Sequence, residues 1–183
     1  MTPAVNQDFT SARAIWRYYQ LMVESLECLQ RAVLSNQPLF PSFSGYLAEE
    51  VDEEFARARS ELDDEVTLAL VSSFESELRI DYLWRRRRKR RSAITAAFSR
   101  LHRRFGDRPR LEDILDAWKA AVGRAREIGE FKQVLNYRHW LAHGRYWIQD
   151  SGVSPDPYSA LQVGESLLRV LPGFEGLEGG TGR

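Results

Sequence analysis

The sequence predicts an all-α fold, an antiparallel bundle of four to six helices. Apolar residues recur at steps of three and four along most of the chain, which is the spacing of one helix face. No run of alternating β-branched residues indicates a strand, and no internal repeat is visible. Apolar residues make up 43% of the 183 residues, enough for one core. We therefore expect a single helical domain over residues 1–171, followed by a flexible tail.

The first half of the chain predicts three helices. The first covers residues 9–34, where apolar residues return every three or four positions. The acidic stretch 48–65 predicts a short, solvated helix that leads into a long one. The long helix is expected to run without a break from residue 62 to residue 101, because neither glycine nor proline occurs between residue 62 and Gly106.

The second half predicts three further helices and the tail. An amphipathic helix covers residues 111–128, and Gly129 is expected to end it. An aromatic-rich helix follows over 131–148, and a last short helix covers 158–170. The tail over residues 172–183 is rich in glycine, so we expect it to be disordered.

Charge is balanced in total but unevenly distributed. Lys and Arg together number 26, as do Asp and Glu. Nearly all the basic residues are arginines, whose planar guanidinium binds phosphate through a fork of donors. This bias is compatible with a phosphate-bearing partner, and equally with a genome rich in arginine codons.

Several classes of protein are disfavoured by features that the sequence lacks. A single cysteine, Cys28, allows no intramolecular disulfide, and its place in an apolar stripe predicts a buried, inert thiol. One cysteine and three histidines do not give metal-ligand spacing, so we expect no metal and no cofactor. Neither a signal peptide nor an apolar run of roughly 18 residues is present, so we expect a cytoplasmic protein with no membrane partner.

Two residues near the end of the aromatic-rich helix are functional candidates. On an ideal helix Arg138 falls near the centre of an apolar side, where a guanidinium must pair with a carboxylate or open into a pocket. His143 falls on a different side, next to Trp140 and Trp147. The structural alternative makes Arg138 a buried ion-pair partner, and His143 a C-terminal residue that favours the helix dipole before Gly144.

The side that carries His143 is too apolar to be left in water. We expect it to face a second subunit in a two-fold dimer. The candidates for that interface are the aromatic residues Trp140, Tyr146 and Trp147.

The segment from Asn136 to Trp147 resembles the signature of HEPN domains (higher eukaryotes and prokaryotes nucleotide-binding). That signature is an arginine, four to six residues and then a histidine, late in a bundle of four or five helices. Arg138 and His143 fit it, and the run from Leu70 to Arg79 is similar to an earlier helix of these proteins. The resemblance implies a metal-independent endoribonuclease, often a toxin or defence effector, that acts as a symmetric homodimer.

One subset of the family pairs with a nucleotidyltransferase-type antitoxin, which makes an antitoxin a possible partner here. In that subset a tyrosine two positions after the histidine is modified. This chain has Arg145 at that position and Tyr146 next to it, so the resemblance does not extend to this mode of regulation.

The two residue types suit RNA cleavage. An imidazole exchanges protons near neutral pH, so His143 can act as base for the attacking 2′-hydroxyl or as acid for the leaving group. The guanidinium of Arg138 can clamp phosphate oxygens while charge develops on the phosphorane. In two-fold symmetry one such pair from each subunit would meet across the interface.

Three carboxylates on the long helix are candidates to pair with Arg138 and fix its rotamer. Glu77 and Asp81 fall near the apolar side of that helix, whereas ideal geometry turns Glu75 more outward. Glu75 is a candidate because it follows Phe74 in the run that resembles the family. For each of them the structural alternative is an exposed helix carboxylate.

The basic run from Arg85 to Arg91 is the densest charge in the chain and predicts contact with the RNA backbone. The alternatives are a solvated surface, or neutralisation by the acidic stretch within the fold or across a dimer. The RNA-binding candidates are Arg85, Arg86, Arg87, Arg88, Lys89, Arg90, Arg91 and Arg145. The two remaining histidines, His102 and His139, are expected to be structural or surface residues.

Two other functions stay open beside the ribonuclease. One is a non-catalytic HEPN-like module that dimerises or binds a nucleotide or a protein, and the other is a purely helical scaffold. The ribonuclease predicts that Arg138 and His143 face one open cleft. The module predicts a cleft with either residue engaged internally, and the scaffold predicts no cleft.

Overall fold

The computed structural model describes residues 10–35, 40–87, 92–144 and 154–174. Within these ranges every regular element is a helix, which confirms the predicted all-α class. The elements are α1 (Ala12–Leu34), the short 3₁₀ helix η1 (Pro41–Phe43), α2 (Ala48–Arg87), α3 (Ala93–Phe105), α4 (Leu111–Val122), α5 (Ala125–Ala142) and α6 (Pro157–Val170). None of these described helices is both long enough and apolar enough to cross a bilayer.

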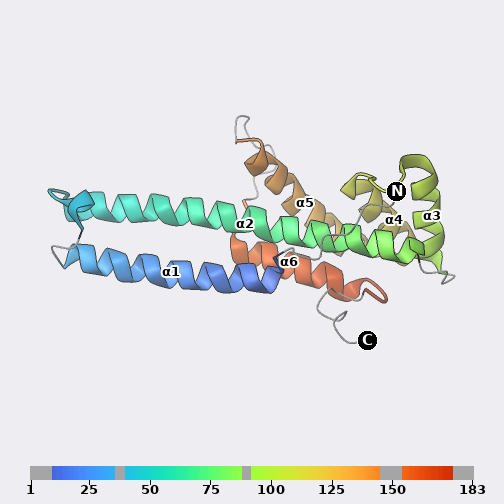
Figure 1. Cartoon of the computed structure of the whole chain (residues 1–183), viewed down its shortest axis with the longest axis horizontal. Helices are drawn as coiled ribbons and strands as arrows, with labels where there is room; N and C mark the ends of the chain where they lie inside the picture. Colours follow the sequence, from blue (N-terminus) through green and yellow to red (C-terminus); the bar gives the residue numbers. More distant parts are fainter. Residues whose placement is uncertain (1–9, 36–39, 88–91, 145–153, 175–183) are drawn as a thin grey trace.

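The long helix α2 is the central element of the bundle (Figure 1). α1 runs antiparallel beside its first part, and α6 lies along its second part. α5 packs against α2 and α6, while α3 and α4 cover the C-terminal end of α2. Beyond α5 and α6 the α1–α2 hairpin projects with no further layer of described helices (Figure 1), and we call residues 20–34 and 41–62 the two-helix arm.

The core lies where α2 meets α4, α5 and α6. Leu70 and Leu78 of α2 are completely buried, and Phe74 packs edge-on against Phe131 of α5, with ring centroids 6.4 Å apart. Burial of a side chain of this size contributes about 1.5–3 kcal/mol. α6 approaches α2 at Gly164, where a Cβ atom would lie only 2.1 Å from the ring of Phe74. Only glycine therefore permits this helix contact.

Both ends of α2 differ from the prediction. The expected short acidic helix and the long helix are one element, and its first turn is capped by Glu50, whose carboxylate accepts the N–H of Leu47 at 2.8 Å. The expectation of an unbroken helix to residue 101 is wrong, because α3 starts anew after Ser92. The Ser92 hydroxyl accepts the N–H of Thr95 at 3.2 Å, and a serine that bonds to the backbone in this way starts a helix.

Gly123, rather than Gly129, separates α4 from α5. Gly123 adopts a φ of 68°, a left-handed conformation that ends α4, whereas Gly129 lies inside α5. α5 ends at Ala142 and is followed by Gly144 with a φ of 77°. The helix predicted over 131–148 therefore starts earlier and ends earlier, and the part beyond residue 144 lies outside the described residues.

α6 confirms the predicted last helix. Asp156 caps it by accepting the N–H of Ser159 at 2.6 Å, and Pro157 occupies the first position, where a missing N–H has no consequence. The predicted disordered tail falls mainly on residues 175–183, which lie outside the described part of the chain.

The prediction that the single cysteine is a buried thiol is wrong. Cys28 is exposed, and its sulfur lies 3.4 Å from a guanidinium nitrogen of Arg31. The reason is its place in the two-helix arm, where α2 covers only one side of α1.

Candidate active site

Arg138 lies on the last turns of α5, against the C-terminal half of α2, with a quarter of its side chain exposed. Its Nη2 atom lies 3.5 Å from Oε2 of Glu75. Its Nε donates to the hydroxyl of Ser72 at 3.4 Å, and Nη1 approaches Nδ1 of His139 at 3.4 Å. Good N–H···O bonds are about 2.7–3.2 Å long, so these three contacts with described residues are at the outer limit.

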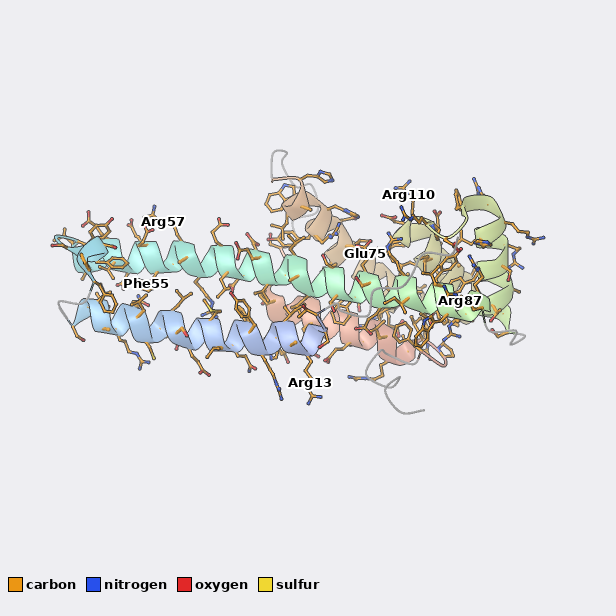
Figure 2. The ribbon with its side chains drawn as sticks, viewed as in Figure 1. Arg13, Phe55, Arg57, Glu75, Arg87 and Arg110 are labelled. Carbon is orange, nitrogen blue, oxygen red and sulfur yellow. The ribbon has the colours of Figure 1, made fainter. Side chains whose placement is uncertain are left out.

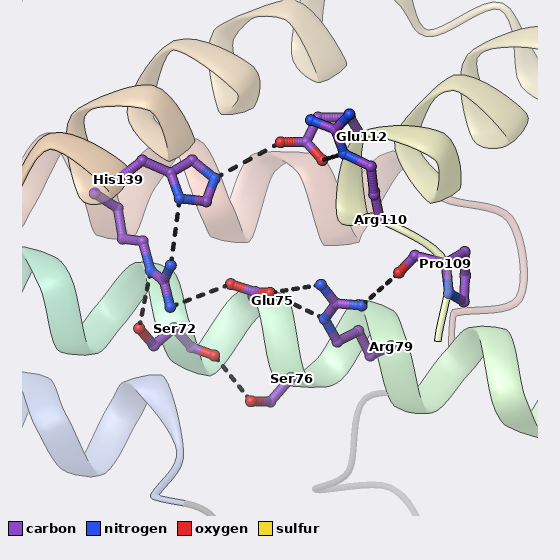
Figure 3. A network of polar contacts seen from close by, with 9 residues as sticks. Ser72, Glu75, Ser76, Arg79, Pro109, Arg110, Glu112 and His139 are labelled. Carbon is purple, nitrogen blue, oxygen red and sulfur yellow. Dashed lines mark hydrogen bonds and ion pairs between the residues drawn. The ribbon is translucent and has the colours of Figure 1, made fainter. Parts of the chain in front are cut away.

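Glu75 is held far more tightly by a second arginine. Arg79 reaches Oε1 of Glu75 from two nitrogens, at 2.8 and 2.9 Å, and donates to the carbonyl of Pro109 at 2.8 Å (Figure 3). Oε2 is buried and has no hydrogen-bond partner among the described residues, and its close charged neighbour there is Arg138. The carboxylate is thus fixed from one side and presented to Arg138 from the other.

The position of Glu75 corrects the estimate from ideal geometry. Its side chain is only 17% exposed, and it is the carboxylate of α2 that meets Arg138. α5 crosses the flank of α2 that carries Glu75, which helical periodicity alone does not reveal. Asp81 is buried but binds Arg85 instead, at 2.8 Å, and Glu77 is half-buried on the same helix.

His139 is a member of this network that the sequence did not single out (Figure 3). A guanidinium only donates, so the contact with Arg138 requires Nδ1 of His139 to accept and places the ring proton on Nε2. Nε2 points toward Oε1 of Glu112 on α4, 3.6 Å away. α2, α4 and α5 thereby share one polar network, which extends to Arg110 through its 3.8 Å contact with Glu112.

His143 is the C-terminal cap residue of α5 and is exposed. Its backbone N–H donates to the carbonyl of His139 at 3.1 Å, so it follows one turn after that residue. The site therefore has Arg138 anchored against α2 and the imidazole of His143 at the exposed end of the same helix.

The aromatic residues near His143 are described only in part. Trp140 is half-buried and packs against Tyr137, with ring centroids 5.5 Å apart. The hydroxyl of Tyr137 donates to Asp64 of α2 at 2.5 Å, which ties this end of α5 to α2. Tyr146 and Trp147 lie outside the described residues, so the dimer interface stays a prediction.

Arg85 and Arg86, the first two residues of the basic run, make contacts within the fold. Arg85 binds Asp81 and the carbonyl of Pro172, and its guanidinium lies 4.8 Å from the ring centre of Trp118. Arg86 pairs with Asp107 and contacts a ring nitrogen of His102 at 2.9 Å. These side chains are 16% and 20% exposed, which disfavours both as RNA contacts.

The other RNA-binding candidates have different positions. Arg87 is exposed at the end of α2. Residues 88–91 and Arg145 lie outside the described part of the chain.

Opposite charges gather at opposite ends of the molecule. The acidic stretch belongs to the two-helix arm and the α2 turns that follow it. The exposed arginines of α3 and the α3–α4 turn lie at the far end (Figure 2, where Arg57 marks the arm and Arg87 and Arg110 mark the other end). α2 rises about 1.5 Å per residue, so Arg85–Arg87 lie about 30 Å or more from Glu65, and the acidic stretch does not pair with these described residues of the basic run within one chain.

A pocket of about 560 Å³ opens beside Arg79. It is lined by Arg79, Tyr82, Leu83, Asp107, Arg108, Pro109, Arg110 and Ile114. Arg138 and His143 do not line it. Within the described ranges, no three His, Cys, Asp or Glu side chains are grouped in a way that could hold a metal ion.

Comparison with known proteins adds no relative. No protein-family model, no curated protein and no solved structure matches this chain.

Proposed function

We propose that the chain is a HEPN-like, metal-independent endoribonuclease that cleaves RNA with Arg138 and His143 at the cleft of a two-fold dimer. The proposal rests on the way Arg138 is held. Glu75 orients its guanidinium, yet its polar contacts with the described residues are 3.4 Å or longer, and a quarter of the side chain is exposed. A phosphate oxygen can replace such weak contacts with shorter, charge-assisted ones.

The exposed imidazole of His143 supplies the proton transfers in this reaction. It takes the proton of a 2′-hydroxyl, whose oxygen attacks the adjacent phosphorus, and the bond from phosphorus to the 5′-oxygen breaks. The imidazole of the second subunit gives a proton to that leaving oxygen. The products are a 2′,3′-cyclic phosphate and a 5′-hydroxyl, while Arg138 stabilises the charge on the phosphorane.

A second candidate is the non-catalytic module that binds a nucleotide or a partner protein. One observation favours it: all three guanidinium nitrogens of Arg138 already have a partner within the chain. The two readings differ in whether these partners give way to phosphate. As a ribonuclease, the protein would be a toxin or defence effector that an antitoxin neutralises.

RNA cleavage in the presence of EDTA tests the ribonuclease. We expect His143→Ala to slow cleavage by about 100- to 10,000-fold and Arg138→Ala by about 100- to 1,000-fold. Arg138→Lys should recover little, because an ammonium cannot form the guanidinium fork. The matched control is Arg126→Ala, since Arg126 is an exposed residue of the same helix whose partner is Glu130.

The outcomes separate the candidates. Normal cleavage by His143→Ala would refute the enzyme and leave the binding module. Light scattering that shows a monomer at micromolar concentration would refute the dimer. An RNA product without a 2′,3′-cyclic phosphate would refute the mechanism.

A further inference from the structure

We propose that the pocket beside Arg79 binds a small organic phosphate, with the phosphate on Arg108 and Arg110 and an attached ring on the apolar floor. The pocket is distinct from Arg138 and His143, and the proposal does not depend on RNA cleavage. It rests on the shape of the pocket, on the arginines at its rim and on the positive end of the molecule in which it lies.

The pocket has the size and the floor of a small-molecule site. Its volume of about 560 Å³ lies within the range of roughly 300–1,000 Å³ that such sites occupy. Tyr82 and Ile114 are almost completely buried, and Pro109 is buried beside them. The hydroxyl of Tyr82 donates to the carbonyl of Gly106 at 2.8 Å, so that polar group is already satisfied. An apolar or aromatic part of a ligand suits such a floor.

Two of the four charged residues that line the pocket are already engaged. Arg79 is bound to Glu75 and to the carbonyl of Pro109, and Asp107 is paired with Arg86. The pocket's single carboxylate is therefore neutralised from outside.

The other two arginines are available to a ligand. Arg108 makes no hydrogen bond or ion pair with any described residue. Among the described residues the Arg110 side chain pairs only with Glu112, at 3.8 Å, and it is 81% exposed. Two guanidinium forks match the several oxygens of a phosphomonoester, and the weak hydration of guanidinium favours this pairing.

The surrounding charge attracts anions to the pocket. Arg87, Arg100 and Arg103 are exposed at the same end of the molecule, away from the acidic arm. The exposed arginines at this end outnumber the carboxylates of α4, and a cleft in a region of net positive charge concentrates anions and raises their association rate. The volume of the pocket suits a ligand of one ring and one phosphate.

Isothermal titration calorimetry of the full chain tests the proposal, with adenosine 5′-monophosphate, adenosine and inorganic phosphate as probes. We expect the monophosphate to bind at least tenfold more tightly than either fragment. Arg108→Ala combined with Arg110→Ala should weaken its binding about 100-fold, roughly tenfold for each charge-assisted contact.

The control is Arg100→Ala combined with Arg103→Ala. This pair removes the same charge from the same end of the molecule but does not line the pocket. We expect it to change the affinity less than threefold. Equal weakening by both pairs would overturn the proposal in favour of unspecific attraction.

Three further results would overturn the proposal. The first is that the monophosphate does not bind at millimolar concentration. The second is that adenosine binds as tightly as the monophosphate. The third is that an RNA oligonucleotide without a terminal phosphate competes for the pocket as strongly as the monophosphate does. His143→Ala should bind the monophosphate like wild type. A loss of RNA cleavage with unchanged monophosphate binding therefore leaves this proposal intact, and the converse result leaves the ribonuclease intact.

Discussion

Arg79 and Arg138 both contact the carboxylate of Glu75, but at different distances. Replacing each arginine is therefore expected to change the stability of the fold by a different amount. Arg79→Ala removes contacts of 2.8 and 2.9 Å, whereas Arg138→Ala removes contacts of 3.4 Å and longer. A hydrogen bond to a charged group contributes about 1.5–3 kcal/mol. Since the Arg79 side chain is 38% exposed, solvent screening brings its pair with Glu75 to the lower end, about 1.5–2 kcal/mol.

Arg138→Ala should destabilise the fold by less than about 1 kcal/mol, because its contacts exceed good hydrogen-bond length. Glu75→Gln should resemble Arg79→Ala, since it keeps the size of the side chain and removes the charge from both pairs. A difference of 1 kcal/mol shifts the melting temperature of a chain of this size by about 2–4 °C. The ranking of the three variants by stability is therefore measurable.

Urea denaturation and thermal melting of the three variants provide the measurement. If Arg138→Ala destabilises the protein as much as Arg79→Ala, then Arg138 is a structural ion-pair partner. The view that phosphate can displace its contacts would then fail, whatever the cleavage assay shows.

Three other predictions concern the fold. Gly164→Ala should destabilise the protein by about 1–3 kcal/mol in calorimetry, because its methyl group would overlap the ring of Phe74; no loss would mean that α6 can move away from α2. Ser92→Ala should lower stability by about 1 kcal/mol and reduce helicity measured by circular dichroism, through the lost cap of α3. Burial, opposed by the charge of Arg86, raises the pKa of Tyr82. The folded state then binds the phenol proton more tightly than the unfolded state, so this stabilisation is present below about pH 10 and is lost as pH rises through the raised value. The stability advantage of wild type over Tyr82→Phe should therefore narrow above pH 10 in urea titrations, and an advantage that stays constant would contradict the raised pKa.

The helical class follows from the sequence because apolar periodicity is a local signal. The helix ends are less predictable, since several residues can end or start a helix and the tertiary contacts select among them. Gly123 and Gly129 are both suitable breaks by composition, yet only Gly123 takes the left-handed conformation. Ser92 starts a new helix in a stretch where the absence of glycine and proline predicts no break.

The candidate site shows the same limit. The pair Arg138 and His143 can be proposed from the sequence, and Glu75 could be named beside them. Which carboxylate meets Arg138 depends on where α5 crosses α2, and that crossing involves residues more than sixty positions apart. Arg79 stands four residues after Glu75, a spacing typical of helix ion pairs, so a search for such pairs would have found it.

α2 is one continuous helix in two different environments, and its backbone should reveal this in hydrogen exchange. In the two-helix arm it packs against α1 and, near its start, against η1, whereas farther along it is enclosed by α4, α5 and α6. Amides with fewer tertiary contacts open at lower free energy, so protection should rise along α2 from residue 50 toward residue 78. The arm can then unwind and reform while the turns that carry Glu75 stay closed. A single helix would thus combine a rigid platform for Arg138 with a segment that exchanges its amides long before the molecule unfolds.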